Sequence, residues 1–142
     1  LIHALDRPDR LFLLIEGPAD RDSVEQLLEL CVHRDRAYTQ LRLARLRNAP
    51  LPHLAAVLAR CHLFIGNDSG VTHLAASVGA PVVALFIATD PARWGPRGRV
   101  HILQGDPSVE EVRALCERVL EATALTRRPQ SRTDLTRSSC PR

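Results

Sequence analysis

The sequence predicts an α/β fold in which helices flank a Rossmann-like parallel sheet. Short runs that are apolar at every position are typical of strands buried on both faces. Loops rich in Gly, Pro, Asn and Asp follow these runs, and stretches of helical period lie between them. The chain has 142 residues, of which 45% are hydrophobic and 25% charged. That length and composition suit one soluble domain with a hydrophobic core.

The first half of the chain contains one clear strand-loop-helix unit. Residues 11–15 form an apolar run, residues 16–20 are a loop, and residues 22–33 have the period of an amphipathic helix. The Arg-rich segment that follows has poor periodicity, and we expect a short edge strand at residues 40–43. A helix over residues 51–60 then leads into the centre of the fold, with Pro52 accommodated in its first turn.

The central unit comprises residues 63–86, LFIGNDSGVTHLAASVGAPVVALF. It predicts a strand at 63–65, a tight loop at 66–70, a short helix at 71–78 and a buried strand at 82–86. Gly79 fits the left-handed position that ends many helices. Because the strands of such a unit run parallel, its first loop lies at the carboxyl edge of the sheet. The helix N-terminus points outward there.

The remaining elements follow in order. A long loop is expected at residues 87–96, where Trp94 is more readily explained as a lid over the core than as the wall of a ligand site. A last strand is predicted at 100–103 and a last helix at 108–121. The predicted domain therefore covers residues 1–121, and residues 122–142 are expected to be a basic, disordered tail.

The charge distribution argues against nucleic-acid binding. The formal net charge is +3, but residues 122–142 hold five Arg and one Asp, which gives +4. Residues 1–121 hold 14 Arg and 15 acidic residues, which gives −1, so the two parts sum to the stated +3. The body of the domain has no excess charge with which to bind a polyanion.

Neither a metal site nor a membrane span is predicted. The four cysteines are far apart, without a C-x-x-C pair, so we expect no zinc site and assign a reduced, cytoplasmic protein. No segment approaches the roughly 20 apolar residues of a spanning helix. The chain starts at Leu1 rather than Met, which leads us to expect a piece of a longer protein.

The start of the helix at 71–78 is the candidate ligand site. Unpaired amides and the positive end of the helix dipole favour an anion there. Ser69 and Thr72 add hydroxyl donors, Gly70 allows close approach, and His73 lies one turn into the helix. Together these groups suit a phosphate or diphosphate.

Two acidic residues need a different explanation, because a carboxylate repels a diphosphate. Asp68 suits the hydroxyls of a group carried on the phosphate, most plausibly a sugar. Asp20, at the end of the first loop, suits ribose hydroxyls. Structural alternatives remain for both regions: Asp68 or Ser69 caps the helix, and Asp20 is a solvated residue of a first helical turn.

The motifs taken together resemble a known enzyme family. Residues 54–96 contain L-A-R-C-x-L-F-I-G-N-D-S-G-x-x-H-L-A-A-S-x-G-x-P-V-V-A-L-F and then T-D-P-x-x-W-G-P. This resembles the donor half of the bacterial ADP-heptose:lipopolysaccharide heptosyltransferases, glycosyltransferase family 9. The G-P-A-D loop at residues 17–20 is similar in kind.

The resemblance implies a fold, a reaction and a set of binding residues. It implies the C-terminal half of a two-domain GT-B glycosyltransferase that inverts the anomeric carbon of ADP-heptose, with no metal and no cofactor. It implies that Asp68 contacts the heptose and Asp20 lies near the ribose. The diphosphate site would consist of Ser69, Gly70, Val71, Thr72 and His73. The general base, and the site for the lipopolysaccharide core acceptor, would belong to an N-terminal domain absent from this chain.

Three departures from the family pattern leave alternatives open. The acceptor domain is absent, Ile87 and Ala88 replace a usual Gly-Pro, and Pro50 replaces a usual Ser or Thr cap. A non-catalytic nucleotide-binding fragment is one alternative. A related glycosyltransferase or epimerase that uses a UDP-sugar is the other. For the full enzyme, the resemblance implies a cytoplasmic place with peripheral association at the inner membrane face.

Overall fold

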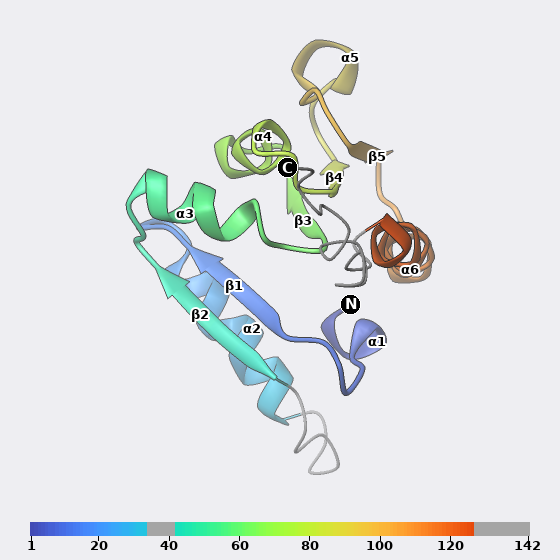
Figure 1. Ribbon diagram of the computed structural model, residues 1–142. Helices are drawn as coiled ribbons and strands as arrows, with labels where there is room; N and C mark the ends of the chain where they lie inside the picture. The colour runs from blue at the N-terminus through green and yellow to red at the C-terminus, as the bar shows by residue number, and fades with distance from the viewer. Residues whose placement is uncertain (34–41, 127–142) are drawn as a thin grey trace, which may run out of the picture.

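The computed structural model describes residues 1–33 and 42–126 (Figure 1). Helices and strands alternate along nearly all of this range. In chain order the elements are α1 (Ile2–Leu5), β1 (Phe12–Glu16), α2 (Arg21–His33), β2 (Leu43–Arg47), α3 (Leu51–Leu58), β3 (Phe64–Asn67), α4 (Gly70–Ser77), β4 (Val82–Phe86), α5 (Pro91–Trp94), β5 (Val100–Gln104) and α6 (Val109–Thr126). The predicted α/β class is confirmed.

Every strand pairing in the described residues is parallel, but the strands form two ladders instead of one continuous sheet. β1 pairs with β2, while β3, β4 and β5 form a three-stranded ladder in that order. Side-chain packing joins the ladders, because Ile15 of β1 and Leu46 of β2 pack on the cluster that contains Leu54 and Leu58 of α3. Each of the five strands is followed by a loop and then a helix, as parallel strands require of their connections.

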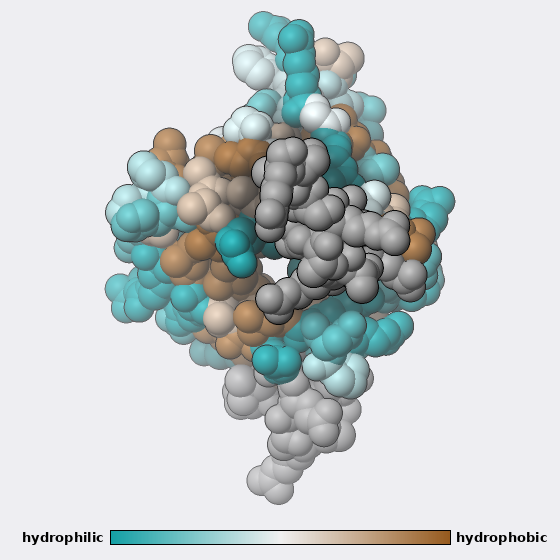
Figure 2. All heavy atoms as spheres, viewed as in Figure 1, coloured by the Kyte–Doolittle hydropathy of each residue, from teal (hydrophilic) through white to brown (hydrophobic). Residues whose placement is uncertain are grey.

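The core lies on both faces of β4. Val82, Val83, Ala84 and Phe86 are fully buried, as the unbroken apolar run predicts for a central strand. One cluster combines α3, α4 and β4, and a second places α6 and α1 against the other face. Apolar residues also gather over α3 and along β1 on the face seen in Figure 2.

Several predicted boundaries shift. The first strand ends at Glu16, one residue into the predicted loop, and the central strand β3 continues to Asn67. The edge strand predicted at 40–43 is wrong in position, since β2 covers Leu43–Arg47 and residues 40 and 41 lie outside the described part of the chain. Arg45 and Arg47 of β2 pair with the buried carboxylate of Glu16. Because charged side chains occupy these positions, β2 lacks the alternation of apolar and polar residues by which a strand is predicted.

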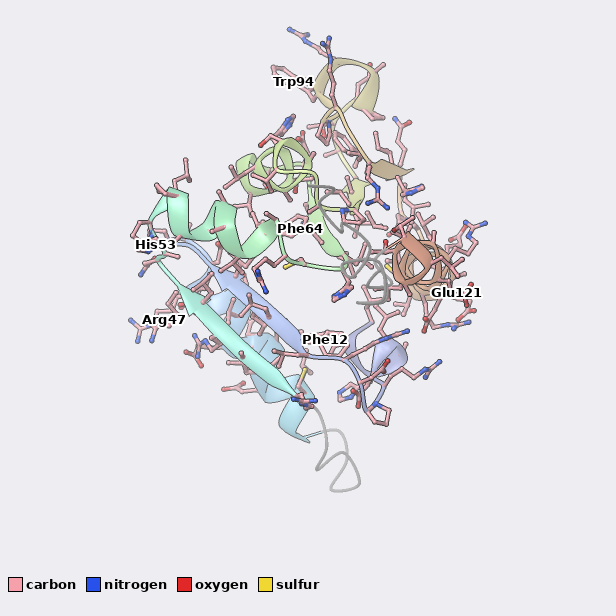
Figure 3. The ribbon with its side chains drawn as sticks, viewed as in Figure 1. Phe12, Arg47, His53, Phe64, Trp94 and Glu121 are labelled. Carbon is pink, nitrogen blue, oxygen red and sulfur yellow. The ribbon has the colours of Figure 1, made fainter. Side chains whose placement is uncertain are left out.

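The segment predicted as a loop at 87–96 contains a short helix, α5. Asp90 caps this helix, because its Oδ1 accepts a hydrogen bond from the amide of Ala92 at 2.9 Å. The prediction that Trp94 covers the core is wrong, since the indole is 52% exposed and lies at the margin of the molecule (Figure 3). The Arg93 guanidinium lies 5.1 Å from the centre of the indole ring and shields part of it.

The last helix is longer than predicted. α6 continues through Thr126, five residues past the expected end at Glu121, because Val119 and Thr123 maintain its buried face. Residues 122–126 are therefore helical and not part of a disordered tail, and residues 127–142 lie outside the described residues. Among the described helices, none is both long and apolar enough to cross a membrane.

A half-buried ion pair fixes α6 to the start of the chain. Arg10 donates two hydrogen bonds to the carboxylate of Glu117, at 2.6 and 3.1 Å, and a third to the carbonyl of Leu5. The hydrogen bonds from Arg10 lower the pKa of Glu117. This contact holds α1 and α6 over the same face of β4.

Candidate functional site

The candidate site lies where β3 ends and α4 begins. β3 is paired on one side with β4, so the loop after Asn67 emerges at the carboxyl edge of the three-stranded ladder. Ala75 and Ala76 are buried and small, and they bring α4 close to the sheet. Gly79 has φ +80° and ends the helix as predicted. Strand and helix together fix the direction of the α4 N-terminus.

Ser69 is the N-cap of α4. Its backbone is extended (φ −156°, ψ 161°), and its Oγ accepts a long hydrogen bond of 3.4 Å from the amide of Thr72. The structural alternative for Ser69 is therefore confirmed, and Asp68 makes no such capping contact among the described residues. Ser69 is nonetheless exposed, so the cap does not close the helix end to a ligand.

The side chain of Thr72 has a structural role. It is fully buried, and its hydroxyl donates to the carbonyl of Asn67. Its Oγ1 also lies 3.1 Å from Ser69 Oγ. Because the Thr72 proton goes to Asn67, the Ser69 hydroxyl is the donor of that second contact. The expected role of these two hydroxyls as phosphate donors is thus not supported, since each is used within the loop.

Gly66 is a residue that sequence reasoning overlooked. A Cβ at this position would lie 2.7 Å from Cε1 of Phe64 and 2.9 Å from Oγ1 of Thr72. Only glycine fits there without displacing the ring or the buried hydroxyl. The signal was present in the sequence as a glycine at the end of a strand, which is typical of close backbone approach.

The backbone amides at the helix start remain available. Within residues 1–33 and 42–126, no hydrogen bond accounts for the amides of Gly70 and Val71, whereas the His73 amide donates to the carbonyl of Ser69 at 3.2 Å. Nothing lies within 4 Å of the Cβ position of Gly70. Two amides at the positive end of a two-turn helix therefore have no partner among the described residues, and unpaired amides at a helix start favour an anion.

Asp68 and His73 lie next to each other at the start of α4. His73 Nε2 is 3.8 Å from Asp68 Oδ1, and their side chains are 48% and 24% exposed. A protonated imidazole would thus be positioned by the carboxylate beside the free amides. The acid offers hydrogen-bond acceptors at the same helix start, which suits hydroxyl groups better than phosphate oxygens.

Asp20 has a local structural role at the end of β1. Its Oδ2 accepts a hydrogen bond from the amide of Gly17 at 2.9 Å, and its carbonyl accepts one from the amide of Val24. The residue thereby closes the G-P-A-D loop and begins α2. Its side chain is exposed at the carboxyl edge of β1, and no contact joins it to residues 66–73 in the described structure.

A buried charge cluster at the ends of β1 and β2 was also missed. Glu16 is 3% exposed and accepts hydrogen bonds from Arg45 at 2.6 and 3.1 Å. Arg47 lies 3.3 Å from the other carboxylate oxygen, and Arg45 also reaches Glu25. The hydrogen bond from Arg45 lowers the pKa of Glu16 against the effect of burial. The cluster ties the carboxyl end of β1, from which the Asp20 loop continues, to β2.

Metal ligands do not gather in the described residues. No group of three or more His, Cys, Asp or Glu side chains is close enough to hold an ion in residues 1–33 and 42–126. Cys31 and Cys116 take part in no disulfide bond among the described residues. The absence of a metal or cofactor requirement stays a prediction.

The fold and the open helix start define a parallel α/β domain of the kind that binds an anionic group at a strand-loop-helix turn. Comparison with known proteins then identifies its family. Residues 6–127 match the model of glycosyltransferase family 9 (heptosyltransferase). The chain belongs to this family.

Individual relatives agree with this assignment. Two proteins named lipopolysaccharide heptosyltransferase 3, from Escherichia coli and its strain K12, are 47% and 49% identical over 45 residues, which is 32% of this chain and 13% of each relative. The crystal structure of a family 9 glycosyl transferase from Veillonella parvula DSM 2008 superimposes with a TM-score of 0.61 at 25% identity. That match covers 88% of this chain but 39% of the solved one, so this chain spans about two fifths of that relative.

Proposed function

We propose that this chain is the donor-binding domain of an inverting, metal-independent glycosyltransferase that transfers heptose from ADP-heptose to the lipopolysaccharide inner core. The observation that carries the proposal is the exposed start of α4, with its free Gly70 and Val71 amides, within a chain that matches family 9 over residues 6–127. The nucleotide-sugar is the ligand and the lipopolysaccharide core is the acceptor, at the cytoplasmic face of the inner membrane.

The proposal gives each of the predicted residues a binding role. The amides of Gly70 and Val71 and the imidazole of His73 bind the diphosphate. Asp68 accepts hydrogen bonds from heptose hydroxyls, and Asp20 does the same for the ribose. Ser69 and Thr72 shape the site from within, because their hydroxyls bond to the loop.

The helix start also favours the departure of ADP. In an inverting transfer the acceptor hydroxyl attacks the anomeric carbon, and the bond to the diphosphate oxygen breaks on the opposite side. Negative charge grows on that oxygen, and fixed amide dipoles stabilise the growing charge without reorganisation. The proton of the attacking hydroxyl goes to a carboxylate of the acceptor domain.

Non-catalytic nucleotide binding is the second candidate function. It is favoured by Ile87, which is 62% exposed in the loop after β4 where the family pattern has glycine. A UDP-sugar donor is a variant of the first proposal. Transfer activity after addition of an acceptor domain separates catalysis from binding, and the nucleotide preference separates ADP from UDP.

Titration calorimetry with ADP, UDP and ADP-heptose tests the proposal directly. We expect saturable binding of ADP, tighter binding of ADP-heptose and weaker binding of UDP. Asp68→Ala should reduce the gain from the heptose while it leaves ADP affinity nearly unchanged, and His73→Ala should weaken ADP itself. Equal losses in both variants for both ligands would contradict the division of roles, and no binding of any of the three would reject the site.

A further inference from the structure

A hollow of about 360 Å³ lies at the edge of the domain opposite the α4 N-terminus. Pro81 precedes β4 and Arg99 precedes β5, so the hollow opens at the amino ends of these parallel strands. α6 forms its other wall. The candidate donor site is at the carboxyl ends, and the two regions share no residue. The volume is in the range of small-ligand sites, which span roughly 300 to 1,000 Å³.

The floor of the hollow is apolar and already packed. Pro81, Leu115 and Val119 line it, and all three are buried, with Leu115 and Val119 belonging to the core cluster beneath α6. Because these side chains are held by the core, the floor does not need to form on binding. Ala122 extends it toward solvent, where its small side chain leaves the hollow open.

The polar residues that line the hollow are all basic. Arg99, His101 and Arg118 are exposed around the apolar floor, and no acidic side chain is among the lining residues. Neither arginine forms an ion pair with a described residue, in contrast to Arg113 on the same helix, which pairs with Glu110. Two arginines beside an apolar floor suit an anion that carries an apolar body.

We propose that this hollow binds a small amphipathic organic anion, with its phosphate or carboxylate at Arg99 and Arg118 and its apolar part on Pro81, Leu115 and Val119. Residues 127–142, which follow α6, carry five Arg and one Asp, so their like charge disfavours them as the occupant. The inference does not rest on the proposed donor site.

Amide chemical shifts of the isotopically labelled 142-residue chain test the proposal, with hexyl phosphate as the probe. We expect saturable shifts at residues 99–101 and 115–122. Inorganic phosphate should bind more weakly because it lacks the apolar part, and hexylammonium should not bind because its charge is wrong. Phosphatidylglycerol vesicles, compared with phosphatidylcholine vesicles, show whether a lipid headgroup is also a source of the anion.

Matched variants separate this site from general charge effects. Arg99→Gln with Arg118→Gln should weaken hexyl phosphate at least about tenfold, because each charge-assisted hydrogen bond contributes roughly one decade of affinity. Ala122→Leu should weaken it by filling the hollow, and Arg113→Gln should leave it unchanged. The proposal is overturned if the double variant binds as the parent does, if hexylammonium binds equally well, or if only vesicles bind.

Discussion

Two glycines of one motif should respond in opposite ways to the same substitution. A methyl group at Gly66 would lie 2.7 Å from the Phe64 ring and 2.9 Å from the Thr72 hydroxyl, whereas one at Gly70 meets nothing within 4 Å. Gly66→Ala therefore overpacks a closed site, for which the free energy of unfolding falls by about 1–3 kcal/mol. Gly70→Ala removes flexibility from the unfolded chain and should raise it by about 0.5 kcal/mol.

Chemical denaturation of the three chains under identical conditions measures both effects. A loss near 2 kcal/mol corresponds to a fall in Tm of about 8 °C for a domain of this size. The clash with the ring can be isolated, because Gly66→Ala should cost less in a Phe64→Leu background, where the two nearest ring atoms are absent. Gly66→Ala that unfolds like the parent chain would refute the packing argument.

The substitution that stabilises the domain, Gly70→Ala, should weaken ligand binding. Gly70→Ala places its methyl group in the open space before the free amides, so ADP affinity should fall although the domain is at least as stable. Such a variant separates the site from the fold, since a general loss of structure cannot explain weaker binding by a more stable chain. Unchanged ADP affinity in Gly70→Ala would mean that the ligand does not approach this end of α4.

Four further outcomes follow from the described contacts. Thr72→Val should lower the free energy of unfolding by about 1–2 kcal/mol, because it removes a buried hydroxyl bond, and Thr72→Ser should recover part of it in denaturant titrations. The hydrogen bond from Arg45 lowers the pKa of Glu16 in the folded chain. The pair therefore stabilises the fold at pH values above the pKa of Glu16 in the unfolded chain. This stabilisation is lost as the pH falls through the pKa of Glu16 in the folded chain. Melts from pH 7 to pH 3 should thus lose less stability in Glu16→Gln than in the parent. His73→Gln should weaken ADP binding in calorimetry, because the substitution removes the imidazole that lies beside Asp68 at the start of α4. Burial raises the pKa of Cys116 to about 11, so mass spectrometry at pH 8 should find this thiol unmodified by iodoacetamide until the chain is denatured.

The central unit could be predicted from the sequence because its patterns are local. The strand at Val82–Phe86 is confirmed at both ends, since five apolar residues bounded by Pro81 and a loop leave no competing structure. The helix at Gly70–Ser77 begins one residue before the predicted start at residue 71, because Ser69 supplies the cap. These features depend on neighbours within a few residues, which the sequence displays.

The remaining features depend on contacts between distant residues. Arg45 and Glu16 are 29 positions apart, so no local pattern shows that the Arg-rich segment contains a strand. The sequence suggested that the hydroxyl of Thr72 is available to a ligand. In the structure this hydroxyl is buried by tertiary packing around Gly66, which no local pattern reveals. Trp94 was expected to be a lid over the core, yet its helix lies in the segment between β4 and β5.

Amide chemical shifts during an ADP titration test the central claim most directly. If the exposed start of α4 binds the diphosphate, the largest saturable shifts occur at the Gly70 and Val71 amides, and adenosine, which lacks the phosphates, leaves both unchanged. Shifts confined to other parts of the domain, with these two amides unmoved at saturating ADP, would contradict the account.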